Sequence, residues 1–307
     1  MNVDISVSIA GLKMKNPTVL ASGVTDVTKK ALENAAGNGA GAVTTKSISL
    51  EPRKGHNTPI LAETPSGFIN AVGLANPGIE EALKEFGGWK SDAPLILNVV
   101  GKDAGEFSLL AEKIAKSGIH VDAVELALSC PHTPGYGTMA GQNTPEATLQ
   151  ILKTVRAKLN VPLIAKLSPN ISALGEVAKA AESGGASAIN MGNSVGPGMV
   201  INIERKAKVL SFGFGGLTGP AIKPIAVRCV YDVYESVKIP IIGTGGITNG
   251  RDAIEMMMAG ASAVGVGTAV YYRGAKVFGM IANEMQEWMK KNEISSLKEI
   301  VGVAHNG

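Results

Sequence analysis

The stretch that decides the fold runs from residue 241 to residue 268 and reads IIGTGGITNGRDAIEMMMAGASAVGVGT. Two short apolar runs, at 241–243 and 263–267, each lead into a glycine-rich turn, and apolar side chains at helical spacing fill 253–259 between them. A strand, a helix and a second strand in this order form the repeating unit of a parallel sheet. The segment therefore predicts an α/β fold.

The same alternation of strand and helix extends back to the N-terminus. Six further strands are predicted at 18–22, 42–46, 95–100, 123–128, 163–167 and 188–191. Helical periodicity is found at 29–36, 79–85, 106–116, 145–159, 174–182, 222–237 and 277–290. Eight strand and helix units in 307 residues favour a closed (β/α)₈ TIM barrel over an open doubly wound sheet, which usually has fewer strands.

Segments outside the eight units complete the predicted architecture. Residues 5–9 and 12–15 predict a short N-terminal β-hairpin that closes the bottom of the barrel. The connections at 47–93 and 193–219 are longer than ordinary loops, so we expect them to carry insertions over the C-terminal rim. No linker or shift in composition divides the chain, and we expect a single domain over residues 1–307.

Composition excludes several classes of protein. The net charge is only +3, and Lys and Arg are scattered among acidic residues, which argues against a nucleic-acid partner. No apolar run reaches the roughly 18 residues that span a membrane, and the N-terminus has no signal-peptide pattern, so we expect a cytoplasmic protein. Cys130 and Cys229 are the only cysteines, too few for an iron–sulfur cluster held by this chain, and no metal site is expected.

Polar residues gather where the predicted strands end. Five such residues lie in or directly after successive strands: Lys46, Asn98, Cys130, Lys166 and Asn193. In a barrel, the functional residues project from the C-terminal ends of the strands. Each has an ordinary alternative, since lysines reach solvent, asparagines form turns and lone cysteines are often buried. Five of them on one rim favour a functional site.

Glycine-rich turns follow the last two predicted strands. They read GTGGI at 243–247 and GVGT at 265–268. Glycines also serve close packing, but these two strands are the usual position of a phosphate site in such barrels. We therefore expect a phosphate-bearing ligand.

Five longer motifs give the chain a resemblance to a known family. They are NAVGLANPG at 70–78, ELALSCP at 125–131, AKLSPN at 165–170, GPGM at 196–199 and GGLTGPAIKP at 215–224. The chain resembles the class 1 dihydroorotate dehydrogenases almost from end to end. Its 215–231 region is most similar to class 1B, in which an FMN subunit pairs with a second subunit that carries FAD and an iron–sulfur cluster.

The resemblance implies an FMN-dependent oxidoreductase that converts dihydroorotate to orotate in de novo pyrimidine (UMP) biosynthesis. Cys130 is implied to be the base that removes a proton while FMN N5 takes a hydride. A thiol with an ordinary pKa of about 8.5 predicts activity that rises with pH. Residues 131–142, rich in glycine and proline, predict a lid over the substrate.

The resemblance also implies binding roles. FMN is expected to contact Ser22, Lys46, Ser47, Asn98, Lys166, Met191, Gly219, Gly245, Gly246, Gly267 and Thr268. Lys166 would stabilise the negative charge of the reduced flavin. The substrate is expected to contact Lys46, Asn70, Ala71, Val72, Gly73, Leu74, Asn193 and Ser194.

The expected partners follow from the same resemblance. They are dihydroorotate and orotate, a second copy in a homodimer and, in a heterotetramer, the FAD and iron–sulfur subunit that would reduce NAD. Fumarate reacting directly at the flavin is the alternative electron acceptor. No membrane partner is expected.

Two positions depart from the family pattern. Ala127 stands where an asparagine usually contacts both flavin and substrate, so one amide contact is missing. His132 replaces a common asparagine and, with Gly141 and Gln142, resembles the flavin domain of dihydropyrimidine dehydrogenases. A flavoenzyme acting on uracil or thymine is therefore one alternative, and an FMN-binding barrel without turnover is another.

The alignment is also open around the sixth predicted strand. Ser194 stands where the family usually has threonine, which keeps the hydroxyl group. Asn190 is an alternative to Asn193 as the residue that faces the substrate.

Overall fold

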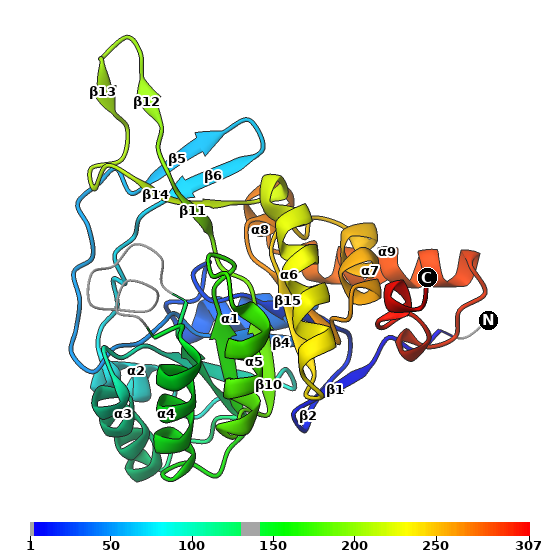
Figure 1. Cartoon of the computed structure of the whole chain (residues 1–307), viewed down its shortest axis with the longest axis horizontal. Coiled ribbons are helices and arrows are strands. Elements are labelled where there is room, and N and C mark those ends of the chain that lie inside the picture. The colour runs from blue at the N-terminus through cyan, green and yellow to red at the C-terminus, as the bar shows by residue number, and fades with distance from the viewer. Residues whose placement is uncertain (1–2, 130–141) are drawn as a thin grey trace.

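A closed barrel of eight parallel strands forms the centre of the computed structural model, which describes residues 3–129 and 142–307. Each strand pairs with the next along the chain, and the last pairs with the first, which confirms the predicted TIM barrel (Figure 1). The strands are β3 (Thr18–Leu20), β4 (Ala42–Thr44), β7 (Leu95–Val99), β8 (Ala123–Ala127), β9 (Leu163–Leu167), β10 (Ala188–Met191), β15 (Ile241–Thr244) and β16 (Ala263–Val266).

Helices cover the outside of the barrel, near the predicted positions. Polar caps start several of them: the Thr144 side chain accepts from the Ala147 N–H, and Asn249 and Asp252 form a capping box. The short α8 was not predicted. Within the described ranges, no helix has the length and apolar character to cross a membrane. The α-helices are α1 (Lys29–Gly37), α2 (Ile79–Phe86), α3 (Ala104–Ser117), α4 (Pro145–Arg156), α5 (Leu174–Ser183), α6 (Lys223–Ser236), α7 (Gly250–Met258), α8 (Ala269–Arg273) and α9 (Val277–Lys291).

The barrel interior is built in layers, because alternate residues of each strand point inward. The bottom layer is apolar and packs against the N-terminal hairpin β1 (Val7–Ile9) and β2 (Leu12–Met14), as predicted. Two residues further along the strands, the inward positions become polar. The bottom layer consists of Val19, Ala42, Ile96, Ala123, Ile164, Ala188, Ile242 and Ala263, and the polar layer of Thr44, Asn98, Glu125, Lys166, Asn190 and Thr244.

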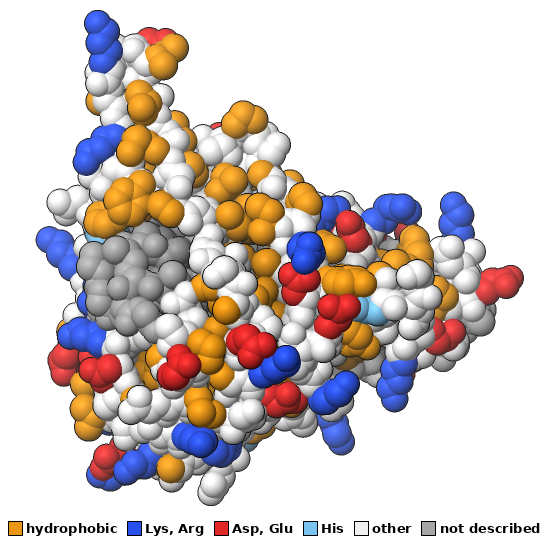
Figure 2. Space-filling model, viewed as in Figure 1, with side chains coloured by type: hydrophobic (Ala, Val, Ile, Leu, Met, Phe, Trp, Pro, Cys, Tyr) orange, Lys and Arg blue, Asp and Glu red, His pale blue; other side chains and the backbone are white. Residues whose placement is uncertain are grey.

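An antiparallel sheet roofs the C-terminal rim. Its order is β11 (Val195–Gly198), β14 (Gly215–Thr218), β6 (Gly67–Asn70) and β5 (Leu61–Thr64), so both predicted insertions contribute strands. The hairpin of β12 (Ile201–Asn202) and β13 (Ala207–Lys208) projects beyond this sheet (Figure 1). Apolar side chains are exposed along it (Figure 2), among them Met199, Ile201 and Ile203.

Candidate active site

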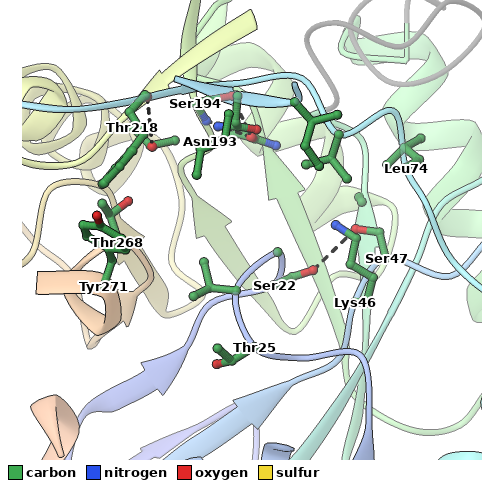
Figure 3. Close-up of a pocket in the computed structure, with 18 of the residues that line it drawn as sticks. Ser22, Thr25, Lys46, Ser47, Leu74, Asn193, Ser194, Thr218, Thr268 and Tyr271 are labelled. Atoms are coloured by element: carbon green, nitrogen blue, oxygen red, sulfur yellow. Dashed lines mark hydrogen bonds between the residues drawn. The ribbon is translucent and has the colours of Figure 1, made fainter. Parts of the chain in front are cut away.

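A cavity of about 460 Å³ lies between the barrel rim and the roof, a size typical of small-molecule sites. The carboxyl ends of β4, β8 and β9 supply one wall, and the roof strand β6 supplies another (Figure 3). Its lining is Ser22, Gly23, Val24, Thr25, Lys46, Ser47, Ile60, Leu61, Phe68, Asn70, Val72, Leu74, Ala127, Lys166, Asn193, Ser194, Thr218, Thr268 and Tyr271.

A smaller cavity of about 110 Å³ adjoins it and shares Ser22, Lys166 and Thr268 with it. Glycines after β14, β15 and β16 line this smaller cavity, so the chain backbone forms its wall. Gly246 has φ +73°, and a Cβ there would lie 2.5 Å from Lys223 Cβ, so both the backbone conformation and the packing favour glycine. Such a backbone-lined recess suits a phosphate group. The predicted glycines at this recess are Gly219, Gly245, Gly246 and Gly267.

Positive charge dominates the base of the larger cavity. Lys46 and Lys166 both line it, and Lys166 is buried. The nearby Asp26 carboxyl is also buried and accepts a hydrogen bond from the Gly23 N–H at 2.5 Å. Burial raises the pKa of Asp26, although the two lysines act in the opposite direction. The cavity therefore suits a ligand that carries or gains negative charge.

Asn193 ties two strand ends together at the rim. Its amide Nδ2 donates to the Ser129 hydroxyl at 2.7 Å, and its Oδ1 accepts from the Ser194 N–H at 2.7 Å. Asn190, the alternative considered above, lies deeper in the polar layer, where it hydrogen bonds to Glu125 and Thr244. Asn193 is therefore the one of the two that lines the cavity.

Ala127 leaves an apolar spot in the cavity wall. Its side chain packs with Val100 and Leu74, and it lies opposite Lys166 in the pairing of β8 with β9. The cavity gains no hydrogen-bonding side chain from this position. The departure from the family pattern thus falls on the wall of the site.

Some predicted site residues lie away from the cavity walls. Asn98 is fully buried in the polar layer, and the Met191 side chain packs in the core between barrel and helices. Ala71 and Gly73 flank the lining residue Val72 without lining either cavity themselves. The catalytic prediction, Cys130, and the predicted lid fall outside the described residues, apart from Gln142, which donates to the Gly101 carbonyl at 2.6 Å.

Several lining residues were not predicted. Thr218 directly precedes Gly219 in the GGLTGP motif, a signal that was available in the sequence. Phe68 and Tyr271 meet edge to face, with ring centroids 4.6 Å apart, but they come from distant segments with no motif to join them.

The sequence comparisons agree with this arrangement. The family model for dihydroorotate dehydrogenase matches residues 4–289. The chain belongs to the dihydroorotate dehydrogenase family. It is 48% identical over 300 residues to the dihydroorotate dehydrogenase B (NAD(+)) catalytic subunit of Pyrococcus abyssi, covering 98% of this chain and 99% of that protein.

Other dihydroorotate dehydrogenases give the same result. The subunit of the same name from Methanocaldococcus jannaschii is 44% identical over 306 residues, covering 98% of each chain. The crystal structure of DHODH from Eimeria tenella in complex with ferulenol superposes with a TM-score of 0.85, covering 99% of this chain and 89% of that one. At 22% identity, it supports the fold alone. The predicted family and its class 1B branch are confirmed.

Proposed function

We propose that this chain is the FMN-bearing catalytic subunit of a dihydroorotate dehydrogenase and oxidises dihydroorotate to orotate in pyrimidine biosynthesis. The observation that carries the proposal is the cavity itself: two lysines, two asparagines and a glycine-lined recess meet at the C-terminal rim of the barrel. Nearly full-length identity to catalytic subunits of that name supports it.

The residues present fit FMN. Gly219, Gly245, Gly246 and Gly267 would surround its phosphate, while Lys166 would lie near its ring. When bound, FMN supplies the acceptor for the hydride that leaves C6 of dihydroorotate. Lys166 would stabilise the negative charge that the ring then carries, because it is a buried cation at the base of the cavity.

The pyrimidine would be held by side chains that both donate and accept hydrogen bonds. Asn70, Asn193 and Ser194 line the cavity and can pair with ring C=O and N–H groups. Cys130 is proposed to take the C5 proton. Its neighbour Ser129 is anchored to Asn193 by a hydrogen bond, so substrate recognition and the proposed base would be coupled through adjacent residues.

The electron acceptor is proposed to be NAD, reached through a partner subunit. The relatives are named as NAD(+) catalytic subunits, which implies that another subunit completes the enzyme. We propose that this partner carries FAD and an iron–sulfur cluster, in a heterotetramer around a homodimer of this chain, in the cytoplasm.

A reduction of uracil or thymine is the second candidate, and Ala127 is the observation that favours it, because the wall lacks the family amide. Titration of the FMN-loaded protein with orotate and, separately, with uracil separates the two, because a ligand stacked on a flavin changes its visible spectrum. Orotate is expected to bind more tightly. Uracil binding without orotate binding would replace the proposal with the second candidate.

Replacement of the proposed base tests the mechanism. Cys130→Ser is expected to retain FMN and orotate binding and to lower the rate of flavin reduction by about 10²-fold or more, in line with the loss of general base catalysis. A reduction rate equal to that of the unmodified protein would remove Cys130 from this role.

A further inference from the structure

Glu125 occupies an unusual position at the centre of the polar layer. It lies on β8, points into the barrel and is completely buried, and it is the only carboxylate in the layer described above. Burying a charge in this way is costly unless that charge is paired and hydrogen-bonded. The surroundings of Glu125 meet both conditions.

Three side chains of the layer converge on this carboxylate. Asn190 donates its Nδ2 to Glu125 Oε2 at 2.6 Å, and Asn98 donates its Nδ2 to Oε1. The ammonium of Lys166 lies 3.7 Å from the same Oε1. One buried acidic side chain thus contacts a cavity-lining cation and two amides.

An ionised carboxylate only accepts hydrogen bonds, so it determines how each amide is turned. Both amides must direct their NH₂ groups towards Glu125, which turns their carbonyl oxygens away. Asn190 Oδ1 then accepts from the Thr244 hydroxyl at 2.8 Å. Asn98 Oδ1 is buried and has no hydrogen-bond partner among the residues that the structure describes.

A buried acceptor without a partner is rare, and a bound ligand is one source of the missing donor. Asn98 lines neither cavity, but it lies one layer below Val100 and Ala127, and Ala127 forms part of the cavity wall. Oxidised isoalloxazine offers a ring N–H as such a donor. A neutral residue in place of Glu125 would leave the amide free to turn its NH₂ group towards the ligand instead.

We propose that Glu125 is a positioning residue of the flavin site, which orients the Asn98 amide as an acceptor and both holds and partly neutralises the Lys166 ammonium. The inference rests on the proposed FMN site. Its electrostatic part has a definite sign. Removal of the Glu125 charge would leave the positive charge of Lys166 without its neighbouring negative charge. The uncompensated ammonium would favour the negatively charged reduced flavin and raise the midpoint potential of the flavin.

The test combines an FMN titration of the apoprotein with a redox titration of the bound flavin. Glu125→Gln is expected to bind FMN about tenfold more weakly, because a turned amide leaves a polar group of the ligand unpaired, and to shift the potential to a more positive value. Glu125→Asp keeps the negative charge, so its midpoint potential is expected to lie closer to that of the unmodified protein than to that of Glu125→Gln. Lys166→Met is expected to shift the potential in the opposite direction.

Two further variants separate positioning from general destabilisation. Glu182→Gln makes the same change at a carboxylate that accepts from the Lys238 and Ile239 N–H groups and lines neither cavity, and it is expected to leave FMN affinity and potential unchanged. Asn98→Ala removes the acceptor without a change in charge, so it is expected to weaken FMN binding with little shift in potential. It also keeps the proposal testable if Glu125→Gln does not fold.

The outcomes distinguish the proposals. Folded Glu125→Gln with the FMN affinity and potential of the unmodified protein would overturn the positioning role, as would Asn98→Ala with unchanged FMN affinity. Failure of the unmodified protein to bind FMN would instead overturn the proposed function on which the inference rests.

Discussion

Introducing an amide at position 127 is a direct way to measure how much affinity for orotate is lost because the cavity wall is apolar there. The Ala127 side chain is 5% exposed, lines the cavity and packs only with Val100 and Leu74 among the apolar residues around it. Ala127→Asn would place an amide beside open cavity space of about 460 Å³, where it can reach a bound ring.

The expected gain follows from the energy of one hydrogen bond. A neutral hydrogen bond contributes about 0.5–1.5 kcal/mol, and about 1.4 kcal/mol corresponds to tenfold in affinity. Ala127→Asn is therefore expected to lower the Kd for orotate by about 2- to 12-fold. The assay is a titration of the FMN-loaded protein with orotate, followed by the visible spectrum of the flavin.

Ala127→Leu is the matched control, because leucine has nearly the shape of asparagine without its polar atoms. It is expected to weaken orotate binding or leave it unchanged. Equal effects of the two variants, or weaker binding by the asparagine variant with FMN retained, would refute the argument that an amide is missing from this wall.

Three other predictions test separate parts of the site. Gly267→Ala puts no Cβ closer than 3.8 Å to another residue, so it should keep the melting temperature but lower FMN affinity by filling the phosphate recess; Gly37→Ala, in an open helical position, should change neither. Burial raises the pKa of Asp252, but the hydrogen bonds from Lys223 and Thr248 together lower it by more. The pKa of Asp252 is therefore below its usual value. The resulting stability is present above about pH 4 and is lost as the pH falls through the folded-state pKa, so Lys223→Met should begin acid unfolding at a higher pH. With Cys130 as base, flavin reduction should rise with pH, and a flat profile would contradict that role.

The barrel strands could be predicted because each is a short apolar run between turn signals. The roof sheet could not, because β6 pairs with the distant β14 (Asn70 with Gly216, 146 positions apart) through a register that only the folded chain defines. Its strands are also short and rich in glycine, as in Gly215–Thr218, which gives them a weak strand signal.

The site shows the same division. Lys46, Lys166 and Asn193 were found because they end strands, and strand ends converge in a barrel. Glu125 was missed as a functional residue, because within β8 it is one polar position in a buried strand, and its contacts with Asn98 and Lys166 come from neighbouring strands. Tyr271 was missed because it lies on α8, a helix of five residues.

Anaerobic mixing of the purified, FMN-loaded protein with dihydroorotate tests the proposed activity most directly, with dihydrouracil as the parallel substrate. Loss of the flavin absorbance with dihydroorotate, and little or none with dihydrouracil, is the predicted result. Bleaching by dihydrouracil alone, or no bleaching with FMN bound, would contradict the assignment.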